Sequence, residues 1–188
     1  MKKYLLVLLT ALMLPCAVQA QQKIDERYAA GAVPVVNGFV VFEQNYTVPG
    51  KSKAQICELL KSYVQLPQAR ITEYSPDEGV LAASIEEYMY FKRTNWQIHR
   101  VRFYYQLVLQ ATDGKLQAQL RRLHYRYDPE VTAGDFDDDR RAEDWITDAN
   151  AFTKNGTKLA RISGKFRTKT IDRKDEIFAA IGKTLGVN

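Results

Sequence analysis

One group of side chains suited to recognition lies along three predicted strands. Tyrosine and arginine alternate there with apolar residues, so these side chains share the outer face of a sheet. Aromatic rings beside guanidinium groups offer flat apolar area with polar tips, which suits binding of a protein or a sugar. A cross-strand ladder that only stabilises a solvated face, or a face covered by the N-terminal segment, is the alternative. The candidate partner-binding residues are Tyr88, Tyr90, Arg102, Tyr104, Gln106, Arg122, His124 and Arg126.

A basic stretch near the C-terminus is a second candidate, because it contains no acid between Thr153 and Thr170. Such a surface could meet lipid phosphates or anionic glycans and give peripheral contact with an anionic surface. Pairing with the acidic segment that precedes it is the alternative explanation. The candidate anion-binding residues are Lys154, Lys158, Arg161, Lys165, Arg167 and Lys169.

A cluster of aspartates could suggest calcium binding or acid catalysis; its members are Asp135, Asp137, Asp138 and Asp139. A calcium loop of twelve residues requires Gly where Arg140 stands and Glu where Ile146 stands, so the match fails. We expect a solvated loop whose last aspartate caps the helix that follows.

Few side chains could serve as metal ligands or as a nucleophile with its base: His99, His124 and Cys57. None has a zinc-type spacing, and no nucleophile elbow or glycine-rich phosphate loop occurs. We therefore expect no catalytic residue, no metal and no cofactor. His124 is expected on the open face of the sheet and His99 in the loop 92–100.

Residues 1–20 have the pattern of a cleaved secretory signal. Lys2 and Lys3 precede an apolar run, and the small-residue exit Val18-Gln19-Ala20 follows. Lipid attachment at Cys16 is the alternative, but Pro15 stands where a small residue is wanted. We expect secretion across the inner membrane and a periplasmic or envelope-associated protein that begins near Gln21.

The mature chain would keep one thiol, Cys57, so an internal disulfide is excluded. This cysteine is either buried or paired with another chain. Removal of Lys2 and Lys3 lowers the formal net charge of +5 by two, to a value ordinary for a soluble protein. No later apolar stretch is long enough to span a bilayer.

The rest of the chain predicts a leader segment at 21–37 and a single domain at 38–188. Alternating and helical periodicities give the order β-α-β-β-β-β-α-α, an α+β fold with a five-stranded antiparallel sheet and helices packed on one face. The expected strands are 40–48, 70–75, 80–91, 101–111 and 115–127. The expected helices are 53–64, opened by a Ser52 and Gln55 capping box, 141–152, and 173–185 with Asp172 as N-cap.

The strand 115–127 changes phase along its length. Leu116, Ala118 and Leu120 have one parity, whereas Leu123 and Tyr125 have the other. A β-bulge at Arg121-Arg122 would keep both sets on the core side.

The sequence resembles secreted Bacteroides-type proteins that carry the domain of unknown function, family 4468, with a TBP-like fold, over nearly the whole mature chain. The stretches that carry this resemblance are Tyr28-Ala29-Ala30-Gly31-Ala32-Val33-Pro34, Gly38-Phe39-Val40-Val41-Phe42, Val48-Pro49-Gly50-Lys51-Ser52, Tyr104-Tyr105-Gln106-Leu107, Glu143-Asp144-Trp145-Ile146-Thr147-Asp148 and Ile162-Ser163-Gly164-Lys165-Phe166-Arg167. The resemblance implies an antiparallel sheet with helices on one side. It supplies no catalytic or binding residues.

These features predict a non-enzymatic binding or assembly module of the cell envelope that uses the open face of its sheet. Its partner would be an envelope protein or a glycan. The TBP-like fold does not imply DNA binding, because fold does not fix function and the signal removes the chain from DNA. The alternative is a periplasmic hydrolase or small-molecule-binding protein whose site the sequence does not reveal.

Overall fold

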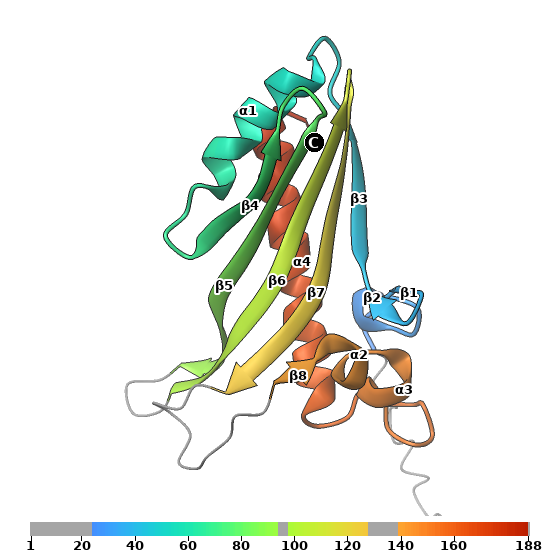
Figure 1. Ribbon diagram of the computed structural model, residues 1–188. Coiled ribbons are helices and arrows are strands. Elements are labelled where there is room, and N and C mark those ends of the chain that lie inside the picture. Colours follow the sequence, from blue (N-terminus) through green and yellow to red (C-terminus); the bar gives the residue numbers. More distant parts are fainter. Residues whose placement is uncertain (1–23, 94–97, 128–138, 188) are drawn as a thin grey trace, which may run out of the picture.

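A twisted antiparallel sheet backed by helices forms the body of the protein (Figure 1). The structure is a computed structural model that describes residues 24–93, 98–127 and 139–187. The predicted signal segment, Asp135, Asp137 and Asp138 lie outside these residues. The strands of the sheet are β3 (Phe42–Thr47), β4 (Ala69–Ser75), β5 (Val80–Arg93), β6 (Ile98–Thr112), β7 (Lys115–Tyr127) and β8 (Arg140–Arg141).

The predicted α+β fold is confirmed, with one difference in strand number. The order across the sheet is β3-β7-β6-β5-β4, and β8 also pairs with β7, which gives six strands rather than five. The sixth strand has two residues, too few to leave an alternating pattern in the sequence.

Alternation of apolar residues explains the long central strands. Val101, Phe103 and Leu107 of β6 all point to the core and are buried. The turn that joins β6 to β7 is Asp113-Gly114, and Gly114 has the positive φ of 76° that favours glycine. The Asp113 carboxylate also accepts a hydrogen bond from the backbone N–H of Lys53 at 2.9 Å, which ties this turn to the first helix.

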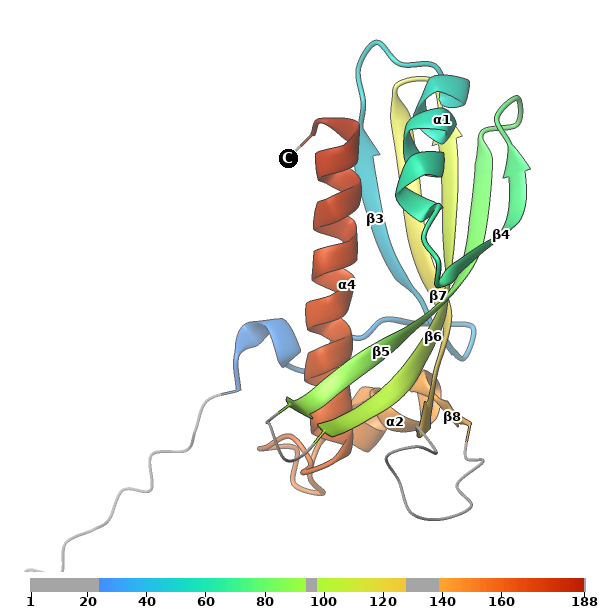
Figure 2. The same ribbon diagram turned by 90° about the vertical axis from the view of Figure 1, so that its left-hand side faces the viewer.

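Two helices cover the same face of the sheet (Figure 2): α1 (Lys53–Val64) and α4 (Ser163–Leu185). The predicted bounds and capping box of α1 are confirmed, since Ser52 and Gln55 exchange both hydrogen bonds. Ile56 and Leu60 of α1 and Ile181 of α4 are fully buried against the sheet. Burial of one apolar stripe on each helix therefore holds the two layers together.

Helix α4 begins at Ser163, so the prediction that the last helix starts at residue 173 is wrong. Phe166, Thr170 and Ile171 are buried and continue the inward face toward the N-terminus. The basic residues between them hide that periodicity in the sequence. Asp172 is consequently not an N-cap; its carboxylate accepts a hydrogen bond from the Tyr28 hydroxyl at 2.6 Å.

The single helix predicted at 141–152 is two short helices, α2 (Ala142–Trp145) and α3 (Asp148–Ala151). The carbonyl of Ile146, which lies between them, accepts a hydrogen bond from Arg167 Nη1 at 2.7 Å instead of continuing a helix. The prediction that Asp139 caps this helix is also wrong. Arg141 holds the N-cap position of α2 without a side-chain hydrogen bond.

The predicted strand 40–48 is interrupted at Val41 and accompanied by a small hairpin. A 3-10 helix, η1 (Glu26–Tyr28), precedes β1 (Val35–Val36) and β2 (Phe39–Val40), which pair with each other. The Val41 N–H donates to the carbonyl of Pro34 at 3.3 Å. Part of the predicted leader segment thus lies along the chain that enters β3.

Arg167 anchors this N-terminal segment to α4, and its side chain is fully buried. The guanidinium donates to the carbonyls of Tyr28 and Ala29 and lies 2.8 Å from the Asp148 carboxylate. Burial lowers the pKa of Arg167, and Asp148 partly opposes that shift. One side chain therefore connects η1, the corner between α2 and α3, and α4.

The predicted β-bulge in β7 is confirmed, one position further along the strand. Gln106 pairs with Arg121 and Tyr104 pairs with His124, so Tyr105 faces both Arg122 and Leu123. Arg122 has a positive φ of 56°, and Leu123 is buried. The extra residue keeps both apolar sets of β7 in the core and turns Arg122 outward.

Replacing Arg167 with methionine should lower the free energy of unfolding by about 2–3 kcal/mol, because buried carbonyl oxygens would lose their donors. Urea denaturation measures this loss. Arg161→Met, at an exposed position near the start of α4, is the control and should change stability by less than about 0.5 kcal/mol. Equal stability of the two variants would contradict the anchoring role.

Arg122→Gly should leave the free energy of unfolding unchanged or raise it by up to about 1 kcal/mol, because glycine adopts the left-handed region without steric cost. Arg121→Gly is the matched control. It should lower stability by about 1 kcal/mol, because Arg121 has no positive φ and its Nε donates to Gln106. Equal losses in thermal unfolding of the two variants would show that no strain resides at Arg122.

Candidate functional site

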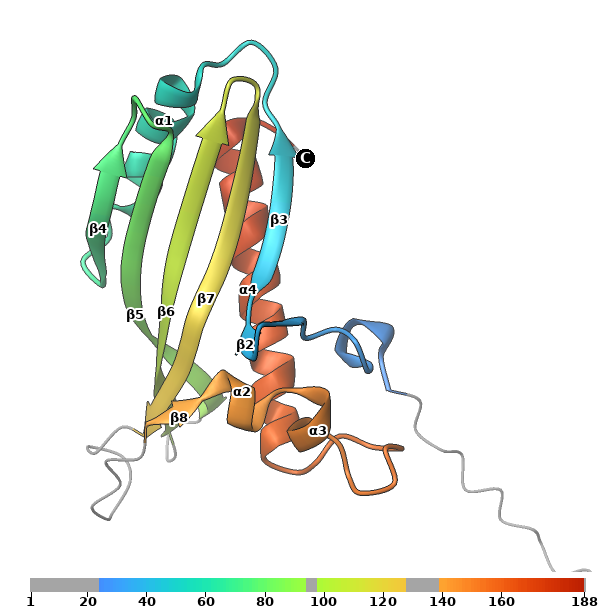
Figure 3. The same cartoon turned by 45° about the vertical axis from the view of Figure 1, so that its right-hand side comes forward.

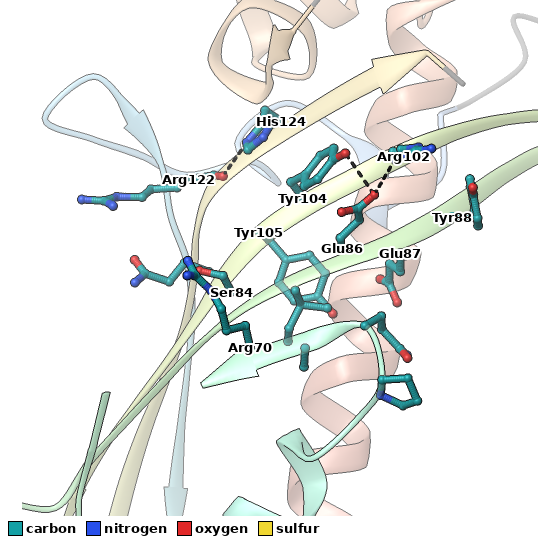
Figure 4. Close-up of a pocket in the computed structure, with 15 residues that line it drawn as sticks. Arg70, Ser84, Glu86, Glu87, Tyr88, Arg102, Tyr104, Tyr105, Arg122 and His124 are labelled. Carbon is teal, nitrogen blue, oxygen red and sulfur yellow. Dashed lines mark hydrogen bonds and ion pairs between the residues drawn. The ribbon is translucent and has the colours of Figure 1, made fainter. Parts of the chain in front are cut away.

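The face of the sheet opposite α4 is turned toward the viewer in Figure 3. It carries a groove that runs from the start of β4 across β5 and β6 to β7 (Figure 4). Its volume is about 760 Å³. Most of its lining side chains project from the open face of paired strands, and Pro67 and Gln68, just before β4, line one end. Ile85, Glu87 and Tyr105 also line it, although they belong to the parity that faces α4. The site is therefore built on regular strands that are fixed by their neighbours.

Six of the eight predicted partner-binding residues line this groove: Tyr88, Arg102, Tyr104, Gln106, Arg122 and His124. The other two lie next to it. Tyr90 follows Tyr88 along β5, with ring centroids 6.3 Å apart, and Arg126 faces Arg102 across β6 and β7. Strand alternation and the bulge bring these residues together from three strands, as the parity argument predicts.

Glu86 connects two of the predicted residues by hydrogen bonds. Its Oε1 accepts from Arg102 Nη1 and from the Tyr104 hydroxyl, each at 3.1 Å. Burial raises the pKa of Tyr104, so its hydroxyl stays protonated at neutral pH and acts as a donor. Contact with the Tyr104 hydroxyl raises the pKa of Arg102, so this guanidinium stays charged.

Aromatic and guanidinium groups cover much of the groove floor. The Tyr104 and His124 rings stack with centroids 4.7 Å apart and an interplanar angle of 3° (Figure 4). Arg100 lies over the Tyr88 ring, 4.1 Å from its centroid. His124 Nδ1 lies 3.2 Å from the Arg122 carbonyl, and its Nε2 lies 3.8 Å from the Asp139 carboxylate. These contacts fix the rings as flat surfaces.

Arg70, Ser84 and Glu86 are among the groove residues that the sequence analysis did not predict. Ser84 and Glu86 have the same parity as Tyr88 in β5, which is a usable signal. Arg70 comes from β4, and only the pairing of Arg70 with Ser84 shows that it joins this surface. The pairing partner of a strand depends on tertiary structure, so the sequence pattern of β4 alone does not place Arg70.

One residue of the predicted anion-binding stretch is not on the surface. Arg167 belongs to the core, which corrects its assignment as an anion-binding residue. The cause is the early start of α4, which turns Arg167 inward between buried positions. Lys154, Lys158, Arg161, Lys165 and Lys169 are exposed on the loop before α4 and on its first turns.

The remaining candidates for chemistry lie apart from one another. His99 is in β6 rather than in a loop, because the strand starts at Ile98. Cys57 is buried in α1, and burial raises the pKa of its thiol. In the part of the chain that the structure describes, no group of three or more His, Cys, Asp or Glu residues could hold a metal ion. None of the helices described is long and apolar enough to cross a bilayer.

Comparison with known proteins gives a family but no activity. The profile of the domain of unknown function DUF4468, with TBP-like fold, matches residues 42–126. The crystal structure of a DUF4468 family protein from Bacteroides ovatus is 31% identical, with a TM-score of 0.77, and the match covers 88% of this chain and 97% of that one. No curated protein matches the chain.

A second solved structure supports the fold alone. The crystal structure of a TBP-like protein from Parabacteroides distasonis has a TM-score of 0.66 at 16% identity, with 82% of this chain and 97% of that chain covered. The profile match covers β3 to β6 and all but the last residue of β7, so it includes the four strands that line the groove. The Bacteroides ovatus relative extends the likeness to most of the chain. The protein belongs to the DUF4468 family of TBP-like fold.

Proposed function

We propose that this protein is an exported binding module of the cell envelope, and that a partner protein or glycan contacts the open-face groove. The observation that carries this proposal is the gathering of guanidinium groups and tyrosines from four strands on one exposed, preformed surface. Arginine and tyrosine are enriched among residues that dominate binding energy, because they combine large contact area with directional hydrogen bonds.

The chemistry of the groove favours binding over catalysis. The raised pKa of Tyr104 disfavours a tyrosinate nucleophile. Glu86 is engaged by Arg102 and Tyr104, and Glu87 forms a two-pronged ion pair with Arg173 at 2.7 and 2.8 Å. Carboxylates held by guanidinium groups in this way serve to position side chains.

The N-terminal sequence supports the proposed location. Lys2, Lys3 and the apolar run before Ala20 match the arrangement that secretion machinery recognises. Cell fractionation should find the full-length protein outside the cytoplasm with an N-terminus near Gln21. A variant that begins at Gln21 behind a start methionine should stay in the cytoplasm. Retention of the full-length chain there would contradict the proposed export.

Cross-linking of the mature protein in envelope extract tests the proposed surface. Wild type should capture a partner, and Arg102→Glu with Tyr104→Ala should lose it, because the substitutions remove a cation and a ring from the floor of the groove. Lys115→Glu is the control, since it reverses an exposed charge at the far end of β7. Capture that persists in the double variant, or no capture by wild type, would refute the proposal.

A further inference from the structure

A row of polar side chains crosses the groove on four neighbouring strands. Arg70 of β4 pairs with Ser84 of β5, Ser84 with Gln106 of β6, and Gln106 with Arg121 of β7. Neighbouring strands lie about 4.8 Å apart, so the row spans about 14 Å from β4 to β7. Arg122, turned outward by the bulge, lies beside the β7 end of this row.

Arg70 and Arg122, near the two ends of this row, form no ion pair with any described residue. The side chains of Arg70 and Arg122 are exposed, line the groove and have no hydrogen bond or ion pair with any residue that the structure describes. Arg102 lies two rows further along the same face of β6. Its Nη1 donates to Glu86, and its Nε is buried without a partner among the same residues. Unpaired guanidinium groups at both ends of a groove favour a ligand with separated negative charges.

The conformation of Arg122 points to a role outside folding. A positive φ of 56° disfavours any residue other than glycine, asparagine or aspartate, yet an arginine occupies this position. Strained residues and bulges concentrate where a side chain must be aimed at a ligand. The bulge alone would be satisfied by glycine, so it does not require the guanidinium.

The centre of the row offers neutral polar groups. The Ser84 hydroxyl and the amide nitrogen of Gln106 have no hydrogen-bond partner within the described part of the chain, while Gln106 Oε1 is held by Arg121 Nε at 3.0 Å. The stacked Tyr104 and His124 rings lie on the next row of the same face. Hydroxyl and amide groups beside flat rings are suited to the hydroxyls and ring faces of a sugar.

The geometry disfavours an extended peptide as the ligand. Ser84 and Gln106 lie in β5 and β6, and each of these strands is paired on both sides at this row. A peptide over this floor could not add a strand to the sheet, so it would lose the main-chain hydrogen bonds that usually give such binding its affinity.

We propose that the open-face groove binds an acidic oligosaccharide whose carboxylates contact Arg70 and Arg122 while its hydroxyls contact the row between them. This inference rests on the proposed binding function and narrows it to one ligand class. Because the two guanidinium groups come from strands about 14 Å apart, a chain of several uronate units should bind better than one unit.

Isothermal titration of the mature protein with hexagalacturonate tests this assignment. Wild type should bind, and affinity should fall steeply as salt increases. Arg70→Ala with Arg122→Gly should weaken binding about tenfold or more, since each substitution removes a charged hydrogen-bond donor. The same variant should keep its unfolding temperature, which separates lost contact from lost folding.

A control variant, two other sugars and an acidic polypeptide test whether binding depends on the groove, on the length and charge of the sugar, and on the sugar itself. Lys115→Ala with Lys183→Ala removes two exposed cations away from the groove and should retain wild-type affinity. Monomeric galacturonate and a neutral hexasaccharide should bind far more weakly than the acidic hexamer. Polyglutamate of equal charge should bind more weakly as well.

Two results would overturn the assignment: absence of hexagalacturonate binding by wild type, or equal affinity for polyglutamate. If envelope capture still depended on Arg102 and Tyr104, only the ligand class would be wrong. If capture also failed, the binding function itself would be wrong.

Discussion

The rest of the structure depends on how β7 places two sets of apolar residues of opposite parity on the same face of the sheet. Leu116, Ala118 and Leu120 must face the helices, and so must Leu123 and Tyr125, although a regular strand cannot turn both parities to one side. One extra residue resolves the conflict, because Arg122 is left out of the alternation. Burial of the apolar side chains on both sides of the bulge outweighs the local backbone strain, since each buried aliphatic or aromatic residue contributes on the order of 2 kcal/mol.

The same bulge shapes the candidate site. It shifts His124 into the row of Tyr104 and Glu86, where the imidazole stacks on the tyrosine ring. It also directs Arg122 to solvent beside the Arg121 and Gln106 pair. A packing requirement on one face of the sheet thereby determines the arrangement of polar groups on the other face.

Helix α4 fixes the sheet from behind and thus supports the groove floor. Arg173 of this helix holds Glu87 of β5 in a bidentate ion pair, and the Tyr46 hydroxyl of β3 donates to the carbonyl of Phe178 at 2.7 Å. Gly182 permits the Tyr46 ring to approach the helix closely. A floor anchored at both edges needs little reorganisation to receive a ligand, which favours affinity.

Local patterns in the sequence predicted much of this arrangement. Alternation predicted the central strands, the capping box predicted the start of α1, and the change of phase in β7 predicted the bulge. The same parity argument placed most of the groove residues on one face. Local patterns gave wrong predictions in two places. Charged residues occupy helical positions at the start of α4, and the helix predicted at 141–152 is divided into α2 and α3.

Only tertiary structure decided those points, for one physical reason. The buried guanidinium of Arg167 donates to the carbonyl groups of Tyr28, Ala29 and Ile146, which lie 139, 138 and 21 residues away from it in sequence, so no local pattern contains the interaction. Arg70 joined the groove because β4 pairs with β5, which is likewise a long-range choice. The sequence by itself determined which faces are apolar and where the chain turns; the tertiary structure decided which polar groups meet, because their partners come from separate segments.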